Sequence, residues 1–465
     1  MAGISSSANI LNILKIVYRD GVQSLLFRNS PVLRTMKISR TEGKELRYAA
    51  MYGRGGACGG DYTVVKAAAT ETARNEEWKT VPGQIFSALT INQKEILASK
   101  SRKGAYMTVL GNKVFAALEA ERKQLAKALY GTGYGEFGVA TTAVTALTVG
   151  SNTITLQEEE VIGIDVGSQF RFITPGANAT LDGTATVGVS INTVTAIDGT
   201  TVTFTATNAD EVSVGDVLCY EGSRDPNSLP LLPVGLGAWL PTVGNRTGTA
   251  WAGYIAQPLY GVIRNKATDR LAGQFVLSPA AGTYKIADVI SDLFRKCRRA
   301  GAEVDRIVLN DRKYAELIAE IQAATTYWQS INDSNKAGKT GATKGFNDIS
   351  FAFSTSWLDK VIDDPYCPYN KVFILEKKNL ELMTYSRAEQ VINDGISDNE
   401  PGKADPESED GAAYDTKGAT INWDDLVTIE PGTATQEGPA FCVSFNIYGT
   451  FVLFNTANSG VAVLQ

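Results

Sequence analysis

Four glycines stand close together at Gly131, Gly133, Gly135 and Gly138, within the segment ALYGTGYGEFG. Closely spaced glycines bind phosphate when they follow a strand and open a helix, because the helix N-terminus supplies free N–H groups. Here the glycines follow a helical pattern, and the carbonyl end of a helix repels phosphate. We therefore predict a helix end without a nucleotide site, with Gly131 as the left-handed residue that follows the helix.

A second phosphate-binding pattern is incomplete. Gly338, Lys339 and Thr340 match the last three residues of a Walker loop. Asp333 stands where the loop needs its first glycine, and no apolar strand precedes the segment. The pattern indicates a mobile, basic, glycine-rich loop.

Carboxylates are the main candidates for acid–base chemistry, because the chain has no histidine. Asp363 and Asp364 are adjacent, and a second group of carboxylates lies in residues 394–415. The members of that group are Asp394, Asp398, Glu400, Asp405, Glu407, Glu409, Asp410 and Asp415. Neither group forms a paired motif, and the second lacks the spacing of an EF-hand. We predict a solvated acidic loop and no catalytic, cofactor-binding or metal-binding residue.

The cysteines do not suggest a disulfide framework or a zinc site. Their number is odd, they lie far apart, and no two are spaced as CxxC. They are Cys58, Cys219, Cys297, Cys367 and Cys442. We expect buried, reduced thiols in a protein made in the cytosol.

The bulk composition is that of a soluble globular protein. The chain has 465 residues, a hydrophobic content of 44% and a net charge of −6, which allows about two to four domains. A protein that wraps DNA is normally basic, so a dedicated nucleic-acid binder is not expected. The apolar stretch at residues 10–17 is too short for a signal peptide, and no run of 18 apolar residues predicts a membrane span.

The clearest element is a helix over residues 105–130, in which apolar residues recur at spacings of three and four. At 1.5 Å per residue it would be roughly 39 Å long. Before it, residues 44–91 read as two strands joined by a glycine-rich middle, with Pro82 marking an edge or a bend. Such a projecting hairpin buries little surface alone and needs a partner surface.

Residues 140–222 are rich in Thr, Val and Gly, with frequent turn signals. VTALTVGSNTITL (Val144–Leu156) resembles VTAIDGTTVTF (Val194–Phe204), with an offset of 48 residues from Ile154 to Val202. Each copy leads to a Val-Gly pair, at Gly167 and at Gly215. We infer two related hairpin units that close one small barrel, although Thr/Val-rich strands can look alike without being repeats.

Residues 285–322 predict a helix, a short buried strand and a second helix. Five residues of the first helix share one face: Ile286, Val289, Ile290, Leu293 and Cys297. Gly301 ends this helix, RIVLN is the strand, and the second helix starts from Asn310 or Asp311 as its N-cap.

The order of these elements resembles the major capsid protein of tailed bacteriophages, with its HK97-like fold. The segments that carry the resemblance are NSPVLRTMKISRTEGKELRYAAMYGRG, LEAERKQLAKALYGTG and AGAEVDRIVLNDRKYAEL. The second is similar to the end of the family's spine helix and its Leu-x-Gly-x-Gly turn. The third is similar to the helix–strand–helix passage of the family's axial domain.

The resemblance implies an α+β fold with a small β-barrel domain inserted into it. The expected parts are an N-terminal arm (1–43), an extended loop (44–91), a peripheral domain with the spine helix (92–139), the inserted β-barrel domain with its internal repeat (140–222), an axial domain (226–385), and an acidic loop with strands that return to the peripheral domain (386–465).

The resemblance also implies a structural role without enzymatic activity. The chain would self-assemble into hexamers and pentamers of an icosahedral phage head that encloses double-stranded DNA. It would reside in the virion after assembly in the host bacterial cytoplasm. Expected partners are other copies of the chain, a scaffolding protein, a portal and a decoration protein. Contact with packaged DNA would be weak and non-specific, and no membrane, metal or cofactor is expected.

The sequence departs from the family's simplest form in two places. The 140–222 domain is extra, and no long charged segment precedes the arm, so we expect either a separate scaffolding protein or earlier cleavage. Some relatives join subunits by a lysine–asparagine cross-link. Lys66 is the candidate donor here, but no acceptor can be matched, so we predict no cross-link.

The sequence leaves two alternatives to a capsid protein. A carboxylate hydrolase could use Asp363, Asp364 or the acids of 394–415. A phage tail or adhesin-type binding module could be built around the predicted barrel, but it would give no role to the long helix or to residues 285–322.

Overall fold

The computed structural model describes residues 30–40, 45–53, 58–68, 74–92, 120–141, 144–176, 181, 185–224, 229–280, 284–324, 351–353, 356–358, 360–384, 428–431 and 440–465. Three predictions lie outside these residues: the first part of the long helix (105–119), the Gly338–Thr340 loop and the acidic run 394–415. So does most of the expected N-terminal arm.

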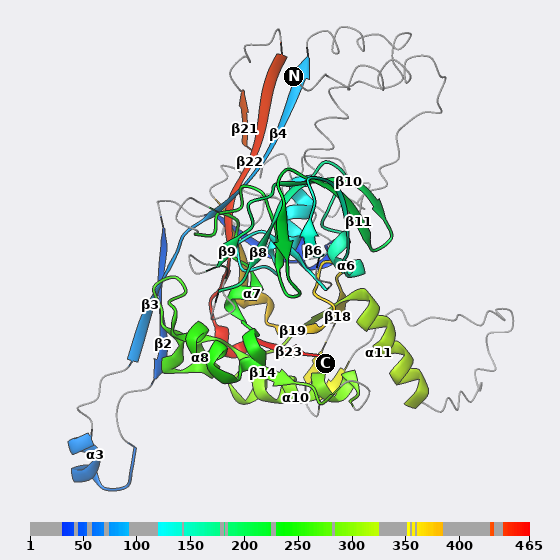
Figure 1. The fold of residues 1–465 in the computed structure, drawn as a ribbon. Coiled ribbons are helices and arrows are strands. Elements are labelled where there is room, and N and C mark those ends of the chain that lie inside the picture. The colour runs from blue at the N-terminus through cyan, green and yellow to red at the C-terminus, as the bar shows by residue number, and fades with distance from the viewer. Residues whose placement is uncertain are drawn as a thin grey trace, which may run out of the picture.

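A five-stranded mixed sheet forms the lower half of the molecule (Figure 1). Its strand order is β14-β23-β19-β15-β18. The strands are β14 (Gln274–Leu277), β23 (Gly460–Val463), β19 (Lys371–Leu375), β15 (Arg306–Leu309) and β18 (Lys360–Asp363). We call it the axial sheet.

The two faces of the axial sheet contact two different cores. Along β15, Ile307 and Leu309 face one core while Val308 faces the other. Along β19, Phe373 and Leu375 lie on the side of Val308. This strict alternation is the period of two expected of strands that are buried on both faces.

Helices α10 (Ile286–Arg299) and α11 (Asp311–Ala324) cover one face of the axial sheet. The five residues predicted to share a face of α10 are all buried, as is Phe294. The helix is followed by Gly301, whose φ of 100° is left-handed. The Asn310 side chain accepts a hydrogen bond from the Arg312 N–H at 3.0 Å, which identifies Asn310 as the N-cap of α11.

A second sheet has the order β1-β20-β22-β21, with β4 paired to β22 as well. Its strands are β1 (Lys37–Arg40), β20 (Leu380–Thr384), β22 (Ala440–Leu453), β21 (Thr428–Pro431) and β4 (Gly83–Asn92). Strands β4 and β22 pair over ten residues and rise together above the body of the molecule (Figure 1).

The chain crosses between these two sheets more often than the sequence suggests. Strand β20 belongs to the second sheet, although the axial domain was expected to extend to residue 385. The last strand, β23, lies inside the axial sheet between β14 and β19 rather than returning to the peripheral domain. The partner of a strand is often a segment far away in the sequence, so a local sequence pattern does not predict which sheet the strand joins.

The projecting hairpin is shorter than the predicted 44–91. It consists of β2 (Leu46–Gly53) and β3 (Arg74–Thr80), which pair antiparallel, whereas the rest of the expected returning strand is β4, which pairs with β22 in the second sheet. Strand β3 ends at Thr80 and β4 begins at Gly83, so Pro82 lies at the break between β3 and β4. The segment between β2 and β3 contains helix α3 (Tyr62–Ala68), which the sequence analysis did not predict.

The inserted region forms a seven-stranded sheet with a core of its own. The strand order is β5-β13-β8-β10-β11-β7, and β9 pairs with β8. The strands are β5 (Glu136–Val139), β13 (Val217–Tyr220), β8 (Gln169–Thr174), β10 (Asn192–Asp198), β11 (Thr201–Ala206), β7 (Gly150–Thr155) and β9 (Thr186–Val187). Strands β6 (Val144–Leu147) and β12 (Asp210–Val212) pair separately. In the described residues these pairings form an open path, so barrel closure stays a prediction.

Two antiparallel ladders of this region each contain one pair of residues that are 48 positions apart. Ile154 of β7 pairs with Val202 of β11, and Arg171 of β8 pairs with Cys219 of β13. Gly167 and Gly215 precede β8 and β13, and each has a φ of 95°. These two pairs have the separation of the predicted repeat, and the repeat itself stays a prediction.

The remaining described elements are short. They are α2 (Pro31–Arg34), α6 (Glu158–Val161), α7 (Leu236–Trp239), η1 (Val243–Arg246), α8 (Gly248–Ala256), η2 (Arg264–Lys266), α9 (Thr268–Leu271), β16 (Phe351–Phe353), β17 (Ser356–Leu358), η3 (Lys377–Asn379) and η4 (Thr456–Asn458). Residues 120–128 are helical and fall within the helix predicted over 105–130, whose earlier part lies outside the described residues.

Candidate intersubunit surface

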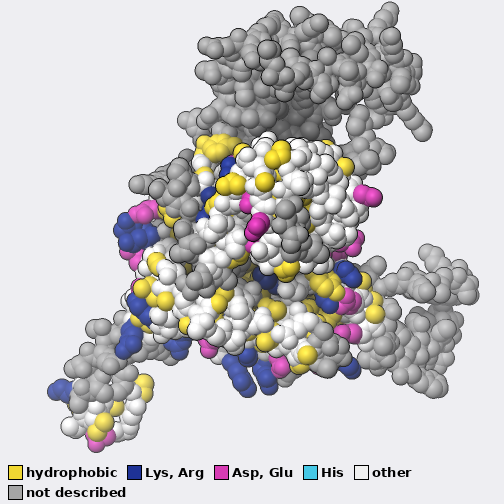
Figure 2. Space-filling model, viewed as in Figure 1, with side chains coloured by type: hydrophobic (Ala, Val, Ile, Leu, Met, Phe, Trp, Pro, Cys, Tyr) yellow, Lys and Arg dark blue, Asp and Glu magenta, His cyan; other side chains and the backbone are white. Residues whose placement is uncertain are grey.

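The most exposed apolar side chains of the hairpin lie toward its far end. We call residues 58–68, which contain α3, the arm tip. Tyr62 is 77% exposed and Val64 is 65% exposed, and Met51 near the end of β2 is 62% exposed. Figure 1 shows α3 far from both sheets, and Figure 2 shows apolar side chains on its surface. Helix α3 was missed because its seven residues give too short a pattern to separate from a loop.

The base of the hairpin is fixed to the body by aromatic side chains. Trp78 of β3 is 1% exposed, and its ring centroid lies 4.9 Å from that of Trp239. On β2, Tyr48 stacks on Trp78 at 6.4 Å and meets Phe454 edge-on at 5.2 Å. Such aromatic pairs contribute about 0.5–1.5 kcal/mol each beyond the burial of their surface.

Polar contacts hold the same base. The Lys79 N–H donates to the Tyr260 carbonyl at 3.0 Å, and Lys266 forms an ion pair with Glu76. Both contacts join β3 to the segment that follows α8. The hairpin therefore has a fixed base and an exposed apolar tip, an arrangement suited to a contact with another molecule.

Lys66 lies on α3 within the arm tip and is exposed. No acceptor for a cross-link lies beside it among the contacts of the described residues. The absence of a cross-link stays a prediction.

The adjacent carboxylates Asp363 and Asp364 have different environments. Asp363 is exposed, and Asp364 is fully buried. One oxygen of Asp364 accepts hydrogen bonds from the Ser30 hydroxyl at 2.8 Å and the Tyr130 hydroxyl at 2.9 Å. The other oxygen accepts from the Tyr366 N–H at 3.0 Å. Asp364 therefore connects three parts of the chain, which is a structural role.

Burial determines the protonation of Asp364. Removal from water raises the pKa of its carboxyl to about 6, although the hydrogen bonds from Tyr366, Ser30 and Tyr130 oppose this shift. The sequence shows two neighbouring acids but gives no sign that one of them is buried.

The glycine-rich turn after the long helix is a packing site. Gly133 and Gly135 have left-handed φ values of 98° and 71°, and a Cβ on Gly135 would lie 2.6 Å from the Ser223 Cβ. Gly131 is not left-handed, so our prediction for that residue is wrong. The helix ends in a turn, with the Gly131 N–H donating to the Ala128 carbonyl at 3.1 Å, and the left-handed positions come later.

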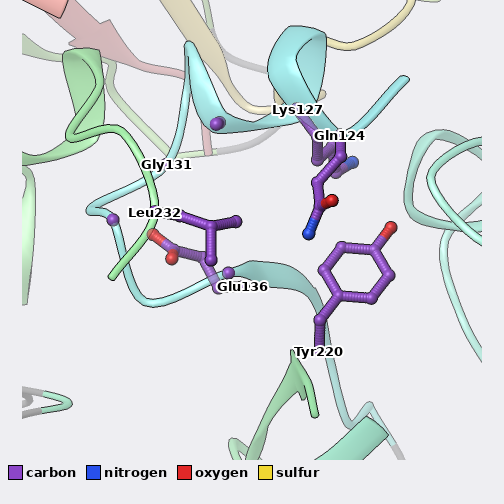
Figure 3. A pocket seen from close by; sticks show the side chains of 9 residues that line it. Gln124, Lys127, Gly131, Glu136, Tyr220 and Leu232 are labelled. Atoms are coloured by element: carbon purple, nitrogen blue, oxygen red, sulfur yellow. The ribbon is translucent and has the colours of Figure 1, made fainter. Parts of the chain in front are cut away.

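A small cavity lies beside this turn (Figure 3). Its volume is about 10 Å³, which is room for roughly one water molecule. Gln124, Lys127, Glu136 and Tyr220 are among its lining residues, and the Gln124 amide points into it (Figure 3). A nucleotide needs a pocket of roughly 300 Å³ or more, so this turn is too closed for one.

The cysteines differ from the prediction at one position. Cys219, Cys297 and Cys367 are buried and unpaired, but Cys58 in the arm tip is exposed. Burial raises the pKa of the Cys297 thiol to about 12. Cys58 has no core to enter because it lies on the projecting hairpin.

Neither a metal-ligand cluster nor a membrane-spanning helix occurs in the part of the chain that the structure describes. No cluster of three or more His, Cys, Asp or Glu side chains there could hold a metal ion. None of the described helices is both long enough and apolar enough to span a bilayer.

Comparison with known proteins identifies the fold. No protein-family profile and no curated protein matches the sequence. Among solved structures, the capsid of Cyanophage A-1(L) aligns with a TM-score of 0.53 and 13% identity, over 98% of this chain and 99% of that one. The capsid of an empty GTA particle aligns over 100% of both chains with 8% identity, at a lower TM-score of 0.45. Encapsulin SrpI from Synechococcus elongatus PCC 7942 aligns over 96% of both chains with 6% identity and a TM-score of 0.41.

The assignment of the fold rests on the cyanophage capsid protein alone, because the other two alignments have TM-scores below 0.5. Its alignment runs through the hairpin, both sheets and the inserted region, because it spans nearly the whole of both chains. This chain therefore has the HK97-like fold of a tailed-bacteriophage major capsid protein.

Proposed function

We propose that this chain is a major capsid protein that forms hexamers and pentamers of an icosahedral phage head around double-stranded DNA. Its role is structural and not enzymatic. It resides in the virion and assembles in the cytoplasm of the host bacterium. A scaffolding protein, a portal and a decoration protein are its proposed partners, and the inserted region closes a small barrel that decorates the head or bridges capsomers.

The observation that carries this proposal is the projecting hairpin. Its base is buried in an aromatic cluster around Trp78, whereas Tyr62 and Val64 at its tip are exposed. A monomer gains nothing from holding apolar side chains so far from its core. In a shell, each tip would be buried on a neighbouring subunit, and symmetry would repeat that contact many times.

The test is assembly of the purified chain, alone and with any co-encoded scaffolding protein, followed by sedimentation and negative-stain microscopy. We expect shells, or rings of five and six subunits. Tyr62→Ser combined with Val64→Ser should reduce assembly without lowering the melting temperature of the unassembled chain.

A matched control replaces two exposed valines of the inserted region, Val166→Ser and Val214→Ser, which are 64% and 66% exposed. Equal loss of assembly in both pairs would contradict the arm tip as the main contact.

The alternative function is a phage tail or adhesin-type binding module. The inserted region favours it, because that region has a hydrophobic core of its own. Fibres or trimers in the same micrographs, without shells or rings, would support this alternative.

A further inference from the structure

Four basic residues gather at the C-terminal end of α10. They are Arg295, Lys296, Arg298 and Arg299, and all four are exposed. We call them the basic turn. No acidic residue interrupts the five positions 295–299. Figure 2 shows Lys and Arg side chains gathered at the lower edge of the molecule, where Figure 1 places α10.

Contacts within the chain leave all four side chains of the basic turn exposed. Arg295 forms an ion pair with Asp292 one turn earlier, at 2.9 Å, with both side chains more than half exposed. The Lys296 ammonium donates to the Phe275 carbonyl at 2.7 Å. An exposed pair of this kind contributes about 0–1 kcal/mol and is weakened by salt. Arg295 therefore stays available to an outside anion.

The helix dipole gives a second reason for cations at this end. It favours lysine and arginine alike, yet three of the four residues are arginines. The planar guanidinium donates two parallel hydrogen bonds to a phosphate, which an ammonium does not. The helix dipole alone does not account for the excess of arginine over lysine in the basic turn, whereas binding to phosphate does.

The basic turn also lies on a definite side of the molecule. α10 packs on the face of the axial sheet that carries Ile307, whereas Tyr130, at the end of the long helix, packs on the face that carries Val308. The helix over residues 120–128 contacts the 140–222 region through the ion pair of Lys123 with Asp165 at 2.7 Å. The basic turn and the inserted region therefore lie on opposite sides of the axial sheet.

In a closed shell, a bulky extra domain has more room on the convex outer side than on the concave inner side. With the inserted region outside, the basic turn faces the interior. We propose that the basic turn of α10 is the surface by which this chain contacts the phosphates of packaged double-stranded DNA. This inference rests on the proposed function and adds the site of contact to it. Three or four cations on a chain of net charge −6 give a contact that holds DNA weakly.

The test uses the full chain before assembly and a fluorescent duplex of about 30 base pairs, with binding followed by anisotropy at rising salt. Each phosphate contact contributes about −0.9 to the slope of log K against log salt. Three contacts predict roughly a 40-fold loss of affinity between about 50 and 200 mM salt. The variant Arg295→Gln, Arg298→Gln, Arg299→Gln should bind more weakly and lose most of that slope.

The matched control removes three exposed cations elsewhere through Arg47→Gln, Lys79→Gln and Lys285→Gln. It should keep most of the affinity and most of the slope. Equal losses in the two triple variants would overturn the proposal, since binding would then follow net charge alone. A synthetic peptide of residues 394–415 is the competing probe. If it occupies the basic turn more tightly than the duplex does, the partner is an acidic protein segment and the DNA assignment is wrong.

Microscopy of the same samples separates this inference from the function on which it rests. Shells from the wild type and from the basic-turn variant, together with unchanged DNA binding, would refute the DNA contact and leave the capsid proposal standing. Failure of the wild type to form any shell or ring would refute the capsid proposal, whatever the DNA binding.

Discussion

Replacing Asp364 by Asn should change how the stability of this protein depends on pH. The Asp364 carboxyl is fully buried and has a folded-state pKa of about 6, against an ordinary value of 3.8. Because folding raises this pKa, the carboxyl contributes its full stability below pH 3.8 and loses it as the pH rises through about 6. The loss is about 3 kcal/mol in total, since a difference of about two units corresponds to roughly that free energy.

An asparagine at position 364 has a similar shape and does not titrate. Its amide can donate to the Ser30 and Tyr130 hydroxyls, which now donate to the carboxylate. From about pH 4.5 to about pH 7, the free energy of unfolding of the wild type should fall relative to that of Asp364→Asn by about 2 kcal/mol. For a cooperative unit of about 250 residues this is a relative shift in melting temperature of roughly 4 °C.

The assay is thermal unfolding of unassembled protein across this pH range, in buffers of equal ionic strength. The control is Asp363→Asn, which changes the exposed neighbouring carboxyl and should leave the profile parallel to that of the wild type. Parallel profiles for the wild type and Asp364→Asn would refute the reasoning, because they would mean that Asp364 does not change its protonation on unfolding.

Three further predictions concern packing and exposure. Trp78→Ala should lower the free energy of unfolding by about 3–5 kcal/mol, because it removes a large buried side chain from the aromatic cluster. It should also speed protease cleavage in the hairpin. Met51→Ala, at a site that is 62% exposed, should change neither the stability nor the cleavage rate. Gly235→Ala should prevent stable folding, because its Cβ would lie 2.1 Å from a backbone carbonyl oxygen. The cooperative melting transition should then be lost. Gly60→Ala is the control and should melt like the wild type, because no atom lies within 4 Å of its new Cβ. Cys58→Ser should remove a rapidly reacting thiol in labelling of the folded protein, because Cys58 is exposed; an unchanged labelling rate would mean that the arm tip is covered.

Much of the fold could be predicted from patterns that repeat within a short stretch of chain. The buried stripe of α10 follows from spacings of three and four, and the pairing of β2 with β3 follows from two strands interrupted by glycines. The 48-residue repeat stays a prediction, although Ile154 and Val202, which are 48 positions apart, pair in the structure. In each case the relevant residues are near in sequence, or their similarity is visible in the letters.

The intersubunit surface was predicted only in outline. The sequence indicates an exposed hairpin that needs a partner, but it does not indicate α3 or the exposure of Tyr62 and Val64. Gly131 shows a related error, because several glycines followed the helix and local chemistry alone did not choose among them. The left-handed residues are Gly133 and Gly135. Gly133 packs against Val234 and Pro230, and Gly135 packs against Ser223.

The sequence by itself determined the local elements and the lack of any motif for nucleotide, metal or histidine chemistry. Tertiary structure decided which sheet each strand joins, so that β22 and β23 lie in different sheets although they are six residues apart. It also decided that Asp364 is buried while Asp363 is exposed. The physical reason is that helix and strand periods depend on neighbours in the chain. Strand pairing and burial depend on distant segments, such as Ser30, which meets Asp364 across 334 positions of sequence.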